Sequence, residues 1–183
     1  MMQKLRRFAR DDGAAVAMET VLITPLLVWA YMMSFAFFDA YRVYNTTVKT
    51  TYMVADMLSR QTGQVYTHDI QGMADVAGSI VRGASNLRMR ASQISMVAGN
   101  FTVDWSEGVN GAADLFDVNL PDVEHMLPTL PDGESVVLVE MTVTYEAPLN
   151  VGLTVAQFDS FTVVRPRYAG QVICCSSGVP PST

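Results

Sequence analysis

Glu19 is the side chain whose type and position most clearly indicate a chemical role. It is the only charged residue between Ala14 and Phe38. Holding a carboxylate in such an apolar segment costs several kcal/mol unless the group is protonated, reaches water or meets a cation. Glu19 is therefore a candidate functional residue. A carboxylate that stays hydrated at a membrane surface is the alternative, because Glu19 lies only six positions after Gly13.

The two cysteines of the chain, Cys174 and Cys175, are adjacent and near its C-terminus. This arrangement offers neither a disulfide framework nor the ligand spacing of a zinc site. An exported compartment permits oxidation, although adjacent cysteines close only a strained ring. The sequence leaves three states open: two free thiols, a vicinal disulfide, or a disulfide to another chain.

The remaining residues give little support for catalysis or metal binding. The two histidines, His68 and His125, are far apart, and neither adjoins a cysteine or a second histidine. A zinc site or a catalytic triad would need such neighbours. We therefore predict a protein that is not an enzyme and takes no metal or other cofactor. The net charge of −6 also argues against nucleic acid as a partner.

Residues 14–38 form one apolar segment, and it must position Glu19. A helix of about 25 residues reaches about 37 Å, more than the roughly 30 Å of hydrocarbon in a bilayer. Residues 1–13 are the predicted cytoplasmic leader, because they hold a basic cluster that has no counterpart after Asp39. The rest of the chain is then exported. A cleaved secretory signal is the alternative, although its apolar region is usually about 7 to 15 residues long.

The spanning helix is predicted to continue outward as an amphipathic stem over residues 39–61, which contain no Gly or Pro. Apolar residues recur there at steps of three and four, so they share one helical face. We expect this face to pack on the exported domain through Tyr41, Tyr44, Val48, Tyr52, Ala55 and Leu58. Pro25 lacks an N–H and crowds the preceding turn, which predicts a kink in the spanning part.

Residues 62–175 are predicted to form an exported α+β domain, followed by a flexible tail over 176–183. Thr67 is a candidate N-cap for a second helix that ends near Gly83. The stem and this helix need an apolar surface to pack on, which one face of a sheet can provide. The predicted fold is therefore α+β, with a long N-terminal helix, a second helix and an antiparallel sheet of about four strands.

A two-residue period predicts the strands. The first two form a hairpin that turns at residues 98–100, with a bulge between Ala91 and Ile94. Residues 107–133 are rich in Gly, Asp, Asn and Pro and are predicted to be a long connection with a short helical turn. The clearest strand follows at 137–146, with one core face and one mostly wet face, and the last strand is predicted at 161–165.

The N-terminal region shows a specific order of features: a basic leader, a Gly, small residues, a Glu, and an apolar helix with an early Pro. Residues 6–27 read RRFARDDGAAVAMETVLITPLL. This order resembles the TadE/TadG-like minor pilins, or pseudopilins, of the tight-adherence (Tad/Flp) branch of type IV pilus systems. The close resemblance covers roughly residues 6–45. The C-terminal region is similar only in general plan.

The resemblance implies processing at Gly13 and Ala14 and a role for Glu19 in assembly. In that family a membrane-embedded prepilin peptidase cuts after the Gly. The Glu of the mature helix then pairs with a newly exposed α-amino group in the assembling filament. The family pattern has one residue fewer between Gly and Glu than the five of Ala14–Met18. A cut after Ala14, a different register and an uncleaved protein therefore stay open.

The resemblance also implies a structural protein that takes part in assembling a Tad/Flp-type adhesion pilus. Its partners would be other pilin subunits, the prepilin peptidase, the inner-membrane pilus assembly platform and membrane lipid. Its location would be the bacterial inner membrane, single-pass with a periplasmic C-terminal domain, or an extracellular pilus after incorporation. The alternative is an uncleaved single-span protein whose exported domain binds or senses a partner.

Overall fold

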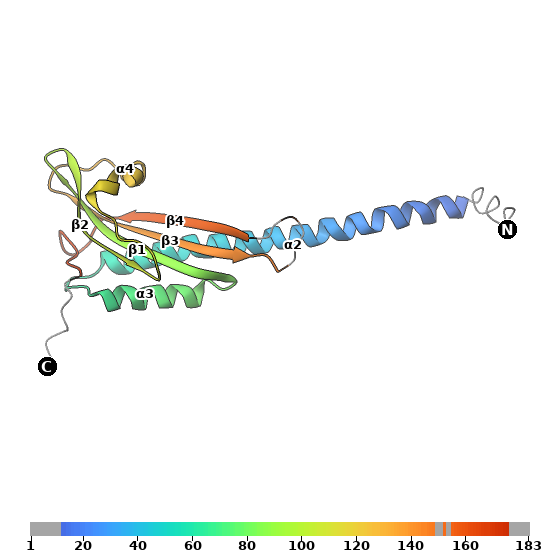
Figure 1. Ribbon diagram of the computed structural model, residues 1–183, viewed down its shortest axis with the longest axis horizontal. Helices are drawn as coiled ribbons and strands as arrows, with labels where there is room; N and C mark the ends of the chain where they lie inside the picture. Colours follow the sequence, from blue (N-terminus) through green and yellow to red (C-terminus); the bar gives the residue numbers. More distant parts are fainter. Residues whose placement is uncertain (1–11, 149–151, 153–154, 176–183) are drawn as a thin grey trace. The chain divides into compact units, whose positions relative to one another are not determined.

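The computed structural model describes residues 12–148, 152 and 155–175, and side chains from Val16 onward (Figure 1). The predicted tail over 176–183 and all but the last two residues of the predicted leader lie outside these ranges. The fold is α+β, as predicted, with a long N-terminal apolar helix, further helices and a four-stranded antiparallel sheet.

The chain divides into two compact units. The first comprises the part up to Ala40 together with residues 147–154. The second comprises Tyr41–Glu146 and the chain from Val155 onward. Helix α2, Asp12–Ser59, is continuous across the boundary at Ala40 and contributes to both units. The apolar run and the sheet-packing stem are therefore two parts of one helix.

The stem part of α2 packs through a different face from the one predicted. Ala55 and Leu58 are buried as expected, but Tyr41 and Tyr52 are 65% and 58% exposed. The buried face consists instead of Val43, Thr47, Thr50, Thr51, Val54, Ala55 and Leu58. Threonine can occupy it because its hydroxyl is satisfied within the helix. Thr47 donates to the Val43 carbonyl at 3.0 Å, and Thr51 to the Thr47 carbonyl at 2.9 Å.

Helix α3, Thr67–Ile80, begins where predicted but with a different cap. Tyr66 is the N-cap residue and Thr67 the first helical residue. The Tyr66 N–H donates to Oδ2 of Asp69 at 3.0 Å, which satisfies a donor of the first turn from inside the helix. The buried face of α3 holds Ile70, Ala74 and Ala77 and lies over β1 and β2.

The sheet has the strand order β2-β1-β3-β4, and all neighbours are antiparallel. The strands are β1 Ala84–Val97, β2 Asn100–Val109, β3 Ser135–Glu146 and β4 Val155–Val164. The predicted hairpin is confirmed, and its turn residues Ala98 and Gly99 both have positive φ, as tight hairpin turns require. A bulge does interrupt the hairpin between Gln93 and Ile94, but its extra residue is Asp104 of β2, which lies opposite no residue of β1. β1 itself pairs with β3 without a shift from Arg88 to Ser95, so Ala91 and Ile94 face opposite sides of the sheet instead of sharing one face.

One face of the sheet packs on α2 and α3, which lie together on that side (Figure 1). The alternation predicted for β3 supplies this face, with Val137, Val139, Met141, Val143 and Tyr145 buried. Phe158 of β4 stacks on Tyr145 at 5.9 Å between ring centroids and meets Tyr44 of α2 edge-on at 5.8 Å. These aromatic contacts fix the stem against the last two strands.

The opposite, outer face of the sheet was predicted to be mostly wet, which is correct only in part, because it is covered at the start of β3 and is half-buried or exposed from Glu140 to Glu146. Val136 and Leu138 of β3 are fully buried there. Residues 110–133 cover them with η1 Asp117–Asn119, α4 Leu120–Val123 and η2 Glu124–Met126. This second core also contains Ile94, Met96, Leu115, Leu120, Val123 and Leu130. Its apolar residues are irregularly spaced along the connection, so they showed neither a helical nor a strand period.

The last strand is longer than predicted. β4 begins at Val155, six positions before the predicted start at Phe161, and ends at Val164. The part before Phe161 carries Gln157, Asp159 and Ser160, which interrupt the apolar pattern that marks a strand in a sequence. The strand forms because it pairs with β3 without a register shift along its whole length.

The two faces of the stem give a direct test of its packing. Leu58 is fully buried, so Leu58→Ala should destabilise the protein by about 2–5 kcal/mol through lost contacts and a cavity. Tyr52→Ala on the exposed face should cost less than about 1 kcal/mol. Chemical unfolding of the full chain in detergent micelles, followed by circular dichroism, measures both values. An equal or larger loss for Tyr52→Ala would contradict this assignment of faces.

Candidate functional site

The N-terminal part of α2 presents a continuous apolar surface. Large side chains from Val16 to Phe38 are exposed along it, among them Leu22, Leu26 and Trp29. The helix is long and apolar enough to cross a membrane. The three hydroxyls of Thr20, Thr24 and Ser34 donate to the carbonyls four residues earlier, at 2.6–2.9 Å. The segment therefore satisfies these polar groups within itself, as a helix in lipid must.

Glu19 lies in the second turn of α2 and is exposed. Its neighbours one turn away are apolar, with Val16 63% and Leu22 71% exposed. It is the only charged side chain among residues 16–38 of the helix. The carboxylate is therefore presented outward from an apolar rod, where a cation of another molecule can reach it.

The other residues singled out in this region lie on the same helix. Gly13 and Ala14 fall in the first turn of α2. Pro25 lies inside α2, which continues through it as one helix. The kink predicted at Pro25 and the processing predicted at Gly13 and Ala14 stay predictions, because the secondary structure bears on neither.

A second group of polar contacts holds the C-terminal segment Arg165–Cys175, here named the strap, against the second unit. The Arg167 N–H donates to the carbonyl of Ser59, the last residue of α2, at 2.8 Å. The Ser135 hydroxyl of β3 donates to the Gly170 carbonyl at 2.8 Å. The Val65 N–H donates to Ile173, and Cys175 donates back to Val65. The strap therefore ties the end of the stem, the α2–α3 link and the sheet together.

Gln93 is the centre of the strap's attachment to the sheet. Its side chain is 1% exposed. Its Oε1 accepts the Val172 N–H at 2.7 Å, and its Nε2 donates to Oδ2 of Asp104 at 2.9 Å. Nε1 of Trp105 donates to the Val172 carbonyl at 2.6 Å. The N–H and the C=O of Val172 are thus both bonded by side chains, one from β1 and one from β2.

Cys174 and Cys175 lie at the end of the strap and are joined in a vicinal disulfide. Cys174 forms an isolated parallel bridge with Val65. Of the three states that the sequence left open, the structure holds the vicinal one. The disulfide is therefore placed at the point where the strap meets the α2–α3 link.

The histidines are not brought together. His68 stacks on Tyr66 at 5.6 Å between ring centroids, with Nε2 3.4 Å from Oδ1 of Asp69, so it contacts the start of α3. His125 is exposed on η2. In the part of the chain that the structure describes, no three His, Cys, Asp or Glu side chains are grouped to hold a metal ion.

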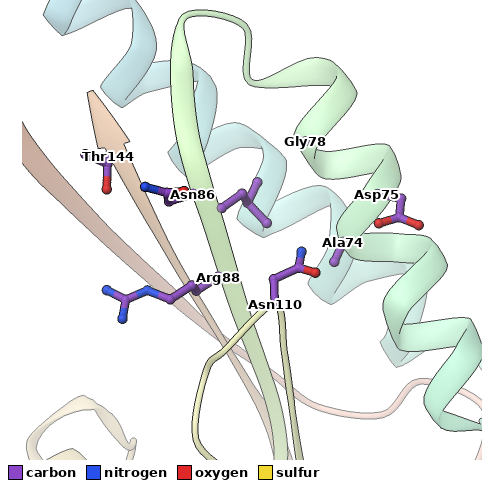
Figure 2. Close-up of a pocket in the computed structure, with 8 residues that line it drawn as sticks. Ala74, Asp75, Gly78, Asn86, Arg88, Asn110 and Thr144 are labelled. Atoms are coloured by element: carbon purple, nitrogen blue, oxygen red, sulfur yellow. The ribbon is translucent and has the colours of Figure 1, made fainter. Parts of the chain in front are cut away.

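A hollow of about 750 Å³ lies where β1 meets α3 (Figure 2). Asn86 has a positive φ at a second irregularity of β1, between Ser85 and Arg88. Figure 2 shows Arg88 and Asp75 on opposite sides of this strand. Their charges do not converge on one point of the hollow, so the arrangement favours no acid–base or nucleophilic chemistry.

Glu107 is the carboxyl group whose environment most alters its ionisation. Partial burial and the nearby Asp114 raise the pKa of Glu107 above its usual value, and a hydrogen bond with the Thr67 side chain opposes this. Thr67 therefore links α3 to β2 instead of capping its own helix. Asp114 itself accepts the Gly108 N–H at 2.7 Å.

No family model, curated protein or solved structure matches this chain. Function must therefore be argued from α2 and from the unit built around its stem. The sequence pointed to Glu19 and the two cysteines but missed Gln93, Trp105 and Val172. The one signal for that cluster was the bulge predicted between Ala91 and Ile94, since bulges redirect side chains.

Removing the centre of the strap attachment should loosen the C-terminal segment. Gln93→Met keeps the side-chain volume but leaves the Val172 N–H and the Asp104 carboxylate without this partner, which should cost about 2–4 kcal/mol. Gln157→Met, on the exposed face of β4, is the matched control and should change stability by less than about 0.5 kcal/mol. Thermal unfolding and limited proteolysis of the full chain provide the measurements. Equal stability of the two variants would show that the attachment is dispensable.

Proposed function

We propose that this chain is a minor pilin-like subunit that takes part in assembling a Tad/Flp-type adhesion pilus and is anchored in the bacterial inner membrane before incorporation. One observation carries the proposal: a single carboxylate, Glu19, is exposed on an apolar helix that is long enough to cross a membrane. The order of residues 6–27, which resembles the TadE/TadG-like minor pilins, supports it.

Glu19 acts in this proposal as an assembly carboxylate. An ammonium group and a carboxylate that enter lipid together offset part of each other's desolvation, whereas either one alone is costly. A pair between Glu19 and the α-amino group of a processed subunit therefore favours one docking register over others. The chain performs no bond chemistry itself, and the energy for extrusion comes from a separate cytoplasmic ATPase.

The second unit supplies a rigid body around the outer part of the same helix. The stem buries its threonine-rich face on the sheet, and Arg167 of the strap bonds to Ser59 at the stem's end. Pulling or docking forces on α2 would thus be transmitted to a folded domain. Other pilin subunits, the prepilin peptidase, the assembly platform and lipid are the partners that this role requires.

An uncleaved single-span protein with an exported binding or sensing domain is the second candidate function. The spacing between Gly13 and Glu19 favours this function, because Ala14–Met18 is one residue longer than the family pattern. In this role α2 would serve only as an anchor, and Glu19 would need no cationic partner from a neighbouring subunit.

Processing distinguishes the two functions. With the prepilin peptidase of the system present, the mature chain should begin at Ala14 or Ala15, and without it the chain should keep the intact leader. Leucine in place of the residue before the cut should abolish it, which means Gly13→Leu for a start at Ala14 and Ala14→Leu for a start at Ala15, whereas Ala9→Leu, within the leader, should not. N-terminal sequencing and intact mass of the protein from its native membrane measure the outcome. An unprocessed N-terminus in every sample would favour the anchored binding protein.

The assembly role of Glu19 has a separate test. Glu19→Gln removes the charge but keeps the shape, so processing should be unchanged while the amount of this chain in sheared pili, or the number of pili formed, falls about tenfold or more. Thr20→Val, at the next position of the helix, is the control and should assemble normally. Quantitative immunoblotting of the pilus and membrane fractions provides the readout. Normal assembly of Glu19→Gln would exclude the pairing role.

A further inference from the structure

The two edges of the sheet differ in whether other residues of the described chain bond to their outward backbone groups. β2 and β4 are the edge strands, since the strand order is β2-β1-β3-β4. An edge strand exposes unpaired N–H and C=O groups that another strand can bond, and proteins usually block such groups. The chain's own residues block the β2 edge.

Two aspartates close the β2 edge. Oδ1 of Asp117 accepts the Val103 N–H at 2.7 Å, and Oδ1 of Asp114 accepts the Gly108 N–H at the same distance. The bulge at Asp104 further disrupts the strand. Residues 114–117 therefore lie along this edge, and an incoming strand cannot reach these amides without displacing them.

These two bonds also fix which backbone groups point outward at β4. In an antiparallel sheet the backbone groups of successive residues point alternately to the two neighbouring strands. The Val103 and Gly108 N–H groups point away from β1, so their partners Ile94 and Arg90 point toward β3. Arg90 pairs with Glu140, so the next residue along β3, Met141, points toward β4 and bonds Ser160. The outward residues of β4 are therefore Val155, Gln157, Asp159, Phe161 and Val163.

The β4 edge is open along its length in the described chain. No backbone hydrogen bond outside the sheet ladder involves residues 155–164 within the described ranges. The ladder to β3 has no bulge, and the strand contains no proline. The side chains of Val155, Gln157, Asp159 and Phe161 are exposed. β4 therefore lacks each of the devices that protect β2.

We propose that the β4 edge receives an extended strand of a different polypeptide, which continues the sheet by main-chain hydrogen bonding. Five outward residues offer five N–H and five C=O groups for this purpose, and main-chain bonding of this kind is an established mode of peptide recognition. Such a partner strand is compatible with both the pilin-like and the anchored binding function.

The surroundings of β4 define the chemistry of the added strand. Side chains on its helix side would lie beside Phe158 and the partly exposed Tyr44, which favours apolar residues there. On the outer side, Asp159 is the only charge in β4, and Phe161 is 46% exposed beside it. A basic or hydroxyl residue opposite Asp159 and an apolar residue near Phe161 complement this side.

A second copy of this chain fits the edge less well than a different polypeptide. Its β2 edge is closed, so the sheet cannot grow head to tail. Antiparallel pairing of two β4 strands through all five outward residues would place Asp159, the central one, opposite the Asp159 of the second copy. Like charges directly opposite each other destabilise a sheet. The edge therefore favours a strand from a different polypeptide.

Photo-crosslinking in the native membrane tests this proposal. The full chain carries p-benzoylphenylalanine in place of Phe161, and the crosslinked peptide is identified by mass spectrometry. We expect an adduct with a segment of a different polypeptide. Gln157→Pro, which removes an outward N–H but no bond to β3, should lower its yield about tenfold or more. Gln157→Ala, which keeps that N–H, should leave the yield unchanged.

Three results would overturn the proposal: no adduct, an adduct to a second copy of this chain, or a yield that Gln157→Pro does not change. Circular dichroism must show that the proline variant keeps its fold. If it does not, Val155→Pro against Val155→Ala at the first residue of β4 makes the same comparison, because the Val155 N–H also points outward and bonds no residue of β3.

Discussion

The structure depends on one helix whose two parts have different surfaces. Up to Phe38 the side chains of α2 are apolar on nearly all sides, whereas beyond Tyr41 the same helix buries one face. The buried face carries threonines and aliphatic residues, and the hydroxyls of Thr47 and Thr51 bond within the helix. Larger aromatic residues stay on the open side.

Other segments of the second unit cover the parts of the sheet that the stem does not. α2 and α3 cover one face of the sheet. The strap, which is bonded to Gln93, covers a further part of this unit separately. The opposite face is closed by the second core over Val136 and Leu138. Each closure uses a segment with little regular structure, so each is held by specific side-chain bonds and a few buried apolar residues.

Two surfaces of the described chain are left uncovered. Glu19 and its apolar surroundings face outward from α2, and the β4 edge faces outward from the sheet, while the β2 edge is closed by Asp114 and Asp117. The two proposed contacts, one through Glu19 and one through the β4 edge, use these surfaces. The polar hollow near Arg88 adds no convergent chemistry to this picture.

The sequence alone determined the long helix, the second helix, the hairpin with its bulge, and β3, because each has a strong period or turn signal over neighbouring residues. It also singled out Glu19, because a lone charge in an apolar segment is visible without a fold. It could not choose the buried face of the stem, since tyrosine and threonine residues compete for it and only the packing of the stem in the folded unit decides. The second core, the Gln93–Val172 attachment and the difference between the two sheet edges join residues far apart in the chain, so only the tertiary structure could decide them.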